Sequence, residues 1–297
     1  MEAEQPFTRQ RRIDQLRLEQ FEVQKQKHQG RLIEEYDAHL FPGTSLGSAS
    51  AVSEHFAQHY DVSQPTVHDI LASIQSRQDK AATWVDMGGG RGLAMRQLAL
   101  SPDLRSDTRF INVDLFDYDL EGLTREELTF LEQRYPGATD ASTKPRTLLA
   151  DMAQVELSTP ADLITSVETI QYLDDPLQAL THWYNNLDDG GHLIVAAEHN
   201  FATWIRYQGT FQSFPLEAFT HALTEHRIAH AFTDESDYVM NRRERPDPSH
   251  MRALTIQKKP HTKLQMSVEP TKTWANDSHY KAVYYPQQTP IEVIEAR

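Results

Sequence analysis

The sequence predicts an α/β protein built on a mostly parallel sheet, and three observations support that fold class. Short apolar segments alternate with helical stretches from residue 82 onward, a pattern typical of parallel strands joined by crossover helices. Two later strand-like segments follow each other without a helical pattern between them, so we expect them to form an antiparallel pair at one edge. The residues before 80 are mostly helical in pattern and precede the first strong strand.

The individual elements follow from these patterns. The expected strands of a seven-stranded sheet lie at residues 83–86, 109–114, 146–150, 162–167, 192–197, 228–232 and 252–256. Helical periodicity predicts crossover helices at residues 93–100, 125–135, 176–187 and 215–226. The segment 241–250 is rich in Arg and Pro, so it is expected to be a loop joining the antiparallel pair. Residues 282–285 and 291–294 are candidates for additional edge strands.

Three regions are expected along the chain: a helical N-terminal arm and cap at 1–79, a core at 80–259 and a C-terminal extension at 260–297. Residues 1–30 are polar and form a poor helical stripe, which indicates a solvated or frayed arm, with a dimerising or substrate-covering arm as the alternative. Residues 31–79 contain helical segments with apolar faces, separated by a small-residue loop at 43–50. We expect this part to cover the acceptor side of the core.

Composition excludes several classes of protein. The 297 residues are 39% hydrophobic and 24% charged, and no run of apolar residues is long enough to span a membrane. The first residues contain no apolar stretch of the kind found in secretory signals. The absence of Cys excludes disulfides and thiolate nucleophiles. With 43 acidic and 29 basic residues, the net charge of −14 disfavours nucleic acid as a partner. The prediction is a cytoplasmic, soluble enzyme or binding protein.

The most informative motif is a glycine-rich turn directly after the first predicted strand. It begins with Asp86 and contains Gly88, Gly89, Gly90 and Gly92. Glycines allow positive φ angles and close approach of the backbone to a ligand, and the helix that follows offers unpaired N–H groups. The motif therefore predicts a nucleotide-like cofactor.

Two common nucleotide motifs do not match this turn. The dinucleotide fingerprint G-x-G-x-x-G requires a third glycine where Leu93 or Met95 stands. A phosphate-binding G-x-x-x-x-G-K-[ST] loop requires a lysine that is absent after these glycines. The arrangement present is D-x-G-x-G-x-G.

In this form the turn resembles the first motif of the class I S-adenosylmethionine-dependent methyltransferases. The resemblance implies a Rossmann-like sheet, S-adenosyl-L-methionine as the cofactor and S-adenosyl-L-homocysteine as the product. It also implies that Gly88, Gly90 and Gly92 lie against the cofactor. Because this cofactor has an ammonium group and no pyrophosphate, Asp86 at the strand end is placed to neutralise it. The resemblance covers about residues 80–258.

Three further segments match the family at similar spacing. Asp114 ends the second strand, where the resemblance implies that it accepts the ribose hydroxyls, with Leu115 beside the adenine. Asp151, followed by Met152, ends the third strand, where family members contact the adenine amino group. Residues 162–176 resemble the fourth strand and the helix after it, and Ser166 near the end of that strand is expected to contact the cofactor.

Candidates for catalysis and acceptor binding come from the ends of the fourth and fifth strands. Glu168 and His199 are the candidate general bases, since a hydroxyl or ammonium acceptor must lose a proton. Tyr172, Trp204 and Tyr207 are the candidate substrate residues. No metal site is predicted, because the histidine pairs at helical spacing lack a third ligand.

We therefore expect a small-molecule O- or N-methyltransferase that acts by direct in-line transfer, with a homodimer through the N-terminal arm as an additional hypothesis. Alternatives are a protein or peptide methyltransferase, a catalytically silent binding or regulatory protein of the same fold, and an NAD-dependent oxidoreductase. A nucleic-acid methyltransferase is disfavoured, because the fourth strand ends in Ser-Val-Glu-Thr and not in an N/D-P-P-Y/F motif.

Overall fold

The computed structural model of the chain describes residues 67–78, 80–117, 120, 123–134, 137, 139–167, 169–170, 173, 176–198, 205–207, 210–212, 220, 223–233, 251–266 and 291–295. The predicted arm at 1–30, the predicted cap up to residue 66 and the candidate edge strand at 282–285 lie outside the described residues. The division of the chain into three regions therefore stays a prediction.

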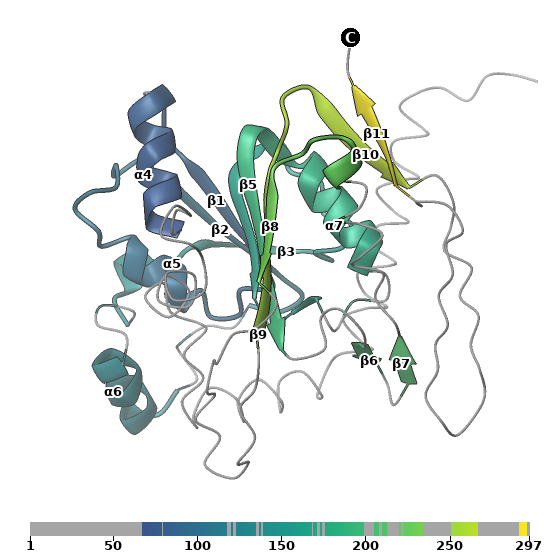
Figure 1. Cartoon of the computed structure of the whole chain (residues 1–297). Helices are drawn as coiled ribbons and strands as arrows, with labels where there is room; N and C mark the ends of the chain where they lie inside the picture. The colour runs from purple at the N-terminus through teal and green to yellow at the C-terminus, as the bar shows by residue number, and fades with distance from the viewer. Residues whose placement is uncertain are drawn as a thin grey trace, which may run out of the picture.

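A seven-stranded sheet forms the centre of the molecule (Figure 1). Its strands are β1 (Thr83–Met87), β2 (Arg109–Asp114), β3 (Arg146–Leu149), β4 (Ala161–Val167), β5 (Leu187–Glu198), β8 (His230–Thr233) and β9 (Met251–Gln257). Their order across the sheet is β3-β2-β1-β4-β5-β9-β8. Neighbours from β3 to β5 are parallel, whereas β9 runs antiparallel to both β5 and β8. The prediction of a Rossmann-like, mostly parallel sheet ending in an antiparallel pair is confirmed.

Strand β5 is longer than predicted, because it begins at Leu187 and not at residue 192. Leu187 already pairs with Ala161, and the register shifts before Leu163 pairs with His192. Gly190 and Gly191 exchange backbone hydrogen bonds with Lys258, at N···O distances of 3.1 and 2.8 Å. The two glycines therefore lie inside an irregular strand and do not form the turn before it.

Helices cover both faces of the sheet (Figure 1). They are α4 (Val67–Gln78), α5 (Leu93–Leu98), α6 (Arg125–Arg134) and α7 (Pro176–Asn185), with a 3-10 turn at Ala141–Thr143. Helices α4 and α5 lie on one side of the sheet in Figure 1, and α7 lies on the other. Of the predicted helix at 215–226, the described residues 220 and 223–225 are helical. None of the described helices is long and apolar enough to cross a bilayer.

Helix α4 is a fixed part of the core. Its apolar stripe of Val67, Ile70, Leu71 and Ile74 is at most 3% exposed. These side chains belong to the same buried cluster as Trp84 of β1 and residues of α5. The hypothesis of a covering cap therefore applies to residues 31–66 and no longer to this helix.

Strand β1 divides its side chains between the two faces. Val85 and Met87 pack in the cluster that contains α7, whereas Trp84 packs in the cluster that contains α4 and α5. Because side chains alternate along a strand, Asp86 shares the α4–α5 face with Trp84. This alternation places the acidic side chain of the motif at the carboxyl end of β1, on the side where the glycine turn leads into α5.

Two small antiparallel ribbons lie outside the main sheet. One joins β6 (Ile205–Tyr207) to β7 (Thr210–Gln212), and the other joins β10 (Thr262–Met266) to β11 (Ile291–Glu295). The predicted strand at 291–294 is confirmed, but β6, β7 and β10 were not expected, because short strands carry too few residues to show a period of two. Strand β10 packs against α7, where Asn185 exchanges two hydrogen bonds with the backbone of Leu264.

Candidate active site

The glycine turn has the backbone geometry that its sequence predicts. Gly88, Gly90 and Gly92 have φ angles of 78°, 55° and 63°, a region that side chains disfavour. The Gly88 N–H donates to the Val113 carbonyl of β2 at 2.7 Å, and the Gly92 N–H donates to the Gly89 carbonyl at 2.9 Å. The turn is therefore fixed to the neighbouring strand before α5 begins.

A row of three polar side chains crosses the sheet beneath this turn. Asp86 of β1 is the register partner of Asn112 of β2 and of Thr165 of β4. Partners on adjacent parallel strands project from the same face, so the row runs Asn112, Asp86, Thr165. Asn112 and Thr165 are each 1% exposed, and Asp86 is 9% exposed. A carboxylate thus lies almost buried between two neutral polar groups.

Asp86 has one hydrogen-bond donor in the row, on the side of β4. The Thr165 hydroxyl donates to Asp86 Oδ1 at 2.7 Å, and it accepts a hydrogen bond from Trp84 Nε1 at 2.8 Å. Burial raises the pKa of Asp86 to about 7; the bond from Thr165 acts in the opposite direction, and the nearby Asp114 raises the pKa further. Among the described residues, no cation compensates this carboxylate.

Gly89 covers the other side of Asp86. A β-carbon at Gly89 would overlap Asp86 Oδ2 and lie 2.7 Å from Asn112 Oδ1. The Asn112 amide donates from Nδ2 to the Gly90 carbonyl at 2.6 Å. Asn112 Oδ1 is buried and has no hydrogen-bond partner among the described residues. Position 89 therefore has room only for a glycine. The D-x-G-x-G-x-G motif did not predict this requirement, because Gly89 stands at one of its variable positions.

Asp114 lies at the end of β2 beside the same turn. Its Oδ2 accepts a hydrogen bond from the Gly90 N–H at 3.1 Å, and its Oδ1 accepts one from the Leu115 N–H at 2.7 Å. Burial raises its pKa to about 6, against the lowering effect of these backbone donors. A hydrogen bond therefore connects the glycine turn directly to Asp114, the acid at the end of β2.

Asp151 and Met152 follow β3 at the same edge of the sheet. Asp151 Oδ1 accepts a hydrogen bond from the Ala153 N–H at 3.0 Å, which closes a turn. Met152 packs against the α7 side of the core, and its carbonyl accepts a hydrogen bond from Trp183 Nε1 at 2.7 Å. The carboxyl ends of β1, β2 and β3 thus bring Asp86, Asp114 and Asp151 to one edge.

Two residues at the end of β4 differ in their placement. Thr169 lies against Gly88 and donates to the carbonyls of Gly88 and Val167, at 3.2 and 2.9 Å. Ser166 is fully buried on the face opposite Asp86, and its hydroxyl has no partner among the described residues. Thr165, and not Ser166, is the residue of this strand that contacts Asp86.

The candidate bases and substrate residues are not placed by the structure. Glu168, His199, Tyr172 and Trp204 lie outside the described residues, and for Tyr207 only the backbone of β6 is described. Their roles stay predictions. No group of three His, Asp or Glu side chains suited to a metal occurs within the described ranges.

Comparison with known proteins gives one strong result. A family profile described as a methyltransferase domain matches residues 55–236, which is more than half of the chain. A search of curated proteins gives no match. Among solved structures, the chain is similar to a S-adenosylmethionine-dependent methyltransferase from Clostridium acetobutylicum, with a TM-score of 0.38 and 12% identity over 71% of this chain and 98% of that one.

Two other solved structures show similar agreement. One is an rRNA methylase from Streptococcus thermophilus, with a TM-score of 0.40 and 14% identity over 65% of this chain and 94% of that one. The other is the Haemonchus contortus phosphoethanolamine N-methyltransferase 2 in complex with S-adenosyl-L-methionine, with a TM-score of 0.42 and 13% identity over 71% of this chain and 56% of that one. These likenesses are distant, so the family match carries the assignment.

Proposed function

The chain belongs to the methyltransferase domain family, and we propose that it transfers a methyl group from S-adenosylmethionine to an oxygen or nitrogen atom of a small-molecule acceptor. The methyltransferase activity and the cofactor follow from the family. The observation that supports the proposed site is the turn from Asp86 to Gly92, which lies beside two acidic side chains with raised pKa values.

The residues at this edge fit the cofactor's chemistry. Asp86 lacks a cation among the described residues and remains 9% exposed, so it can receive an ammonium group. Asp114 retains lone pairs beyond its backbone donors, so it can accept ribose hydroxyls. The proposed cofactor-binding residues are those of the three strand ends and the turn: Asp86, Gly88, Gly90, Gly92, Asp114, Leu115, Asp151 and Met152. The predicted role of Ser166 is not proposed further, because its side chain is fully buried on the face opposite Asp86.

S-adenosylmethionine supplies a reactive methyl group when it is bound. The contribution of the chain is to align the reacting atoms, which accounts for much of the barrier reduction in a displacement of this kind. Glu168 or His199 would accept the proton that a hydroxyl or ammonium acceptor loses. Tyr172, Trp204 and Tyr207 would line the acceptor side.

The choice of a small-molecule acceptor rests on the sequence. The net charge of −14 opposes binding of nucleic acid, and the segment from Ser166 to Thr169 lacks the motif used on base amino groups. We also propose a cytoplasmic location, in keeping with a composition that contains no cysteine and therefore no disulfide.

Thermal unfolding with added ligand tests the cofactor site. S-adenosylhomocysteine should raise the Tm, because a ligand that binds only the native state stabilises it by mass action, and NAD should not. Gly90→Val should weaken S-adenosylhomocysteine binding about tenfold or more, because Gly90 has a φ of 55° and contacts both Asp114 and Asn112. Unchanged affinity in a folded variant would remove the turn from the site.

The acceptor class is tested with labelled cofactor. The full chain is incubated with methyl-labelled S-adenosylmethionine and separate panels of small hydroxyl and amine compounds, peptides and RNA. Transfer to the small molecules is expected, and Glu168→Gln or His199→Gln should lower kcat with little effect on cofactor affinity. Transfer to peptides or RNA alone would contradict the proposed acceptor, and the absence of transfer to all panels despite binding would indicate a silent member of the family.

A further inference from the structure

Two oxygen atoms without a hydrogen-bond donor converge beneath Gly89. Asp86 Oδ2 and Asn112 Oδ1 are both within 3 Å of the position of a β-carbon on Gly89. The bond from Asn112 Nδ2 to the Gly90 carbonyl fixes the amide so that its oxygen lies on this side. Among the described residues, neither oxygen receives a donor. Asn112 Oδ1 is buried and Asp86 is 9% exposed, so a proton on Asp86 Oδ2 that is directed at Asn112 Oδ1 would satisfy both acceptors.

The other carboxylate oxygen of Asp86 is already engaged. Trp84 Nε1 can only donate, so its bond to Thr165 Oγ1 directs the hydroxyl proton of Thr165 toward Asp86 Oδ1. An acid proton on Asp86 therefore has its place on Oδ2, which is the oxygen that lies beneath Gly89 together with Asn112 Oδ1.

We propose that Asp86 and Asn112 share a proton in the cofactor-free protein, and that Asp86 releases this proton to solvent when it receives the cofactor's ammonium group. The second half of this inference rests on the proposed function. In it, Asn112 and Thr165 are positioning residues with opposite effects. The oxygen of Asn112 favours the protonated acid, whereas the hydroxyl of Thr165 favours the carboxylate.

The charged surroundings agree with this assignment. Asp114 on β2 is the charged group, among the described residues, that acts on Asp86, and it disfavours the carboxylate. Arg91 in the turn and Arg96 on α5 are buried cations, but neither is among the groups that shift the pKa of Asp86, and Arg96 donates to the carbonyls of Arg91 and Asp140. Thr165 on β4 does not titrate. The pKa of Asp86, raised to about 7 by burial, places the release of the proton near neutral pH.

The cofactor-free protein provides the first test. The Asp86 carboxyl carbon is followed by carbon NMR from pH 5 to pH 9 in the full chain, and its signal is identified by its loss in Asp86→Asn. We expect a midpoint near neutral pH. Thr165→Val should raise the midpoint and Asn112→Leu should lower it, each by about one pH unit. Thr165→Ser, which keeps the hydroxyl, should titrate like the natural protein.

Opposite displacements are the signature of the shared proton, because general loosening of the site would move both variants in one direction. If Asn112→Leu does not fold, Asn112→Thr takes its place; its hydroxyl can donate to Asp86, so the midpoint should again fall. A midpoint that stays unchanged or rises in the folded Asn112 variant would overturn the proposal.

The second test counts protons during binding. Calorimetric titrations with S-adenosylhomocysteine and with 5′-methylthioadenosine, which lacks the amino-acid end, are made at pH 6 and pH 8, each in two buffers of different ionisation enthalpy. Between pH 6 and pH 8 the affinity for S-adenosylhomocysteine should rise about tenfold relative to that for methylthioadenosine, with release of one additional proton near pH 6. Methylthioadenosine serves as the control for Asp114, whose pKa is about 6.

The two proposals fail in different ways in this titration. Absence of binding by both ligands would contradict the proposed cofactor site. Binding of S-adenosylhomocysteine without an additional released proton, or with the same pH dependence as methylthioadenosine, would overturn the shared proton and leave the cofactor site in place.

Discussion

Asp86 and Asp162 are nearly buried carboxylates at opposite edges of the same sheet, and their surroundings differ in one respect. Asp162 is the second residue of β4 and is 3% exposed; its Oδ1 lies 2.7 Å from Lys80 Nζ, and its Oδ2 accepts a hydrogen bond from the Thr83 N–H at 2.8 Å. Asp86, near the end of β1, has a hydroxyl donor and no cation among the described residues. The chain therefore compensates the buried charge at the amino edge and leaves it uncompensated at the carboxyl edge.

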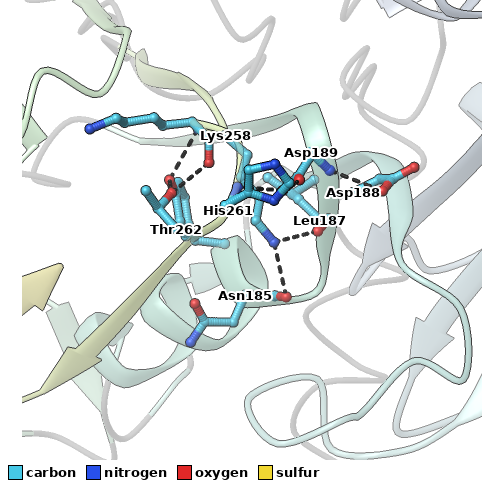
Figure 2. A network of polar contacts seen from close by, with 9 residues as sticks. Asn185, Leu187, Asp188, Asp189, Lys258, His261 and Thr262 are labelled. Atoms are coloured by element: carbon cyan, nitrogen blue, oxygen red, sulfur yellow. Dashed lines mark hydrogen bonds and ion pairs between the residues drawn. The ribbon is translucent and has the colours of Figure 1, made fainter. Parts of the chain in front are cut away.

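The amino edge continues this compensation into the C-terminal part of the chain. Lys80 also lies 2.7 Å from Asp188 Oδ2. The ammonium group of Lys258, buried between α7 and β5, donates to the carbonyls of Leu187 at 2.6 Å and Asn185 at 3.4 Å (Figure 2). Asp189 receives the backbone N–H of His261 at 3.0 Å. Partnered charges hold the strands and the ribbon together at this edge.

The two carboxylates are expected to have different roles: Asp162 stabilises the fold, and Asp86 is proposed to bind a ligand. An uncompensated buried carboxylate costs stability in the free protein, and the ligand that we propose for Asp86 would offset this cost by supplying the missing positive charge. A compensated carboxylate is explained by the fold itself.

The largest effects are expected when each of the two acids is replaced by its amide. Asp86→Asn should weaken S-adenosylhomocysteine binding by about tenfold or more and leave the Tm equal or higher, because a charged contact is lost while the new amide can donate to Asn112 Oδ1. Asp162→Asn should lower the free energy of unfolding by about 1–3 kcal/mol and leave the affinity unchanged, because Lys80 loses a buried partner but stays 37% exposed.

Calorimetric titration and urea unfolding of both variants measure these effects. If Asp86→Asn and Asp162→Asn lose ligand affinity and stability in the same proportion, the two edges of the sheet do not have separate roles.

A second prediction concerns the pH dependence of stability. Burial raises the folded-state pKa of Asp86 to about 7 and that of Asp114 to about 6, above the ordinary value of 3.8 for each. The stability that their protonated forms contribute is present below about pH 4 and is lost as the pH rises through 6 and 7. The cofactor-free protein should therefore lose stability relative to Asp86→Asn between pH 4 and pH 8, by roughly 2–4 kcal/mol.

Urea unfolding of both proteins across this range measures the difference in free energy. If the stability of the natural protein does not fall relative to that of Asp86→Asn as the pH rises, the raised pKa of Asp86 is contradicted. Saturating S-adenosylhomocysteine should abolish this loss of stability in the natural protein.

A third prediction uses two glycines that have the same backbone conformation. Gly88 at the carboxyl edge and Gly190 at the amino edge both have a φ of 78°. A β-carbon at Gly88 would overlap Thr169, whereas one at Gly190 has no atom within 4 Å. Alanine at either position should cost about 1–2 kcal/mol of backbone strain, and only Gly88→Ala should also weaken S-adenosylhomocysteine binding. Equal affinities of Gly88→Ala and Gly190→Ala for S-adenosylhomocysteine would show that the turn at Gly88 is not part of the ligand site.

The sequence predicts the elements of this site better than their mutual arrangement. The glycine turn and the acids at 86, 114 and 151 were found because each follows directly from a strand end or a local motif. Thr165 and Asn112 were not found, because their position beside Asp86 depends on the register of strands that lie far apart in the chain. Ser166 was selected in place of Thr165 for the same reason: one position along a strand decides which face a side chain occupies.

The unexpected strand β10 shows the same limit at the other edge. Its five residues carry no clear periodicity, and its position depends on hydrogen bonds between Asn185 and Leu264 and between the hydroxyls of Tyr184 and Thr262. These contacts join segments that are separated by almost eighty residues. Local patterns therefore predict strands of the main sheet and miss a strand that only tertiary contacts define.

The smallest effect is expected for Lys258, which tests whether the amino edge is independent of the site. Lys258→Met removes the ammonium that donates to Leu187 and Asn185, and the two carbonyls lose a donor. Burial lowers the pKa of Lys258, so loss of the buried charge offsets part of that cost. The free energy of unfolding should fall by about 1 kcal/mol and the Tm by about 2–4 °C, with unchanged affinity for S-adenosylhomocysteine. Lys263→Met, at an exposed position of β10, is the matched control and should change neither quantity. A loss of cofactor affinity in Lys258→Met alone would show that the two edges are coupled through β5.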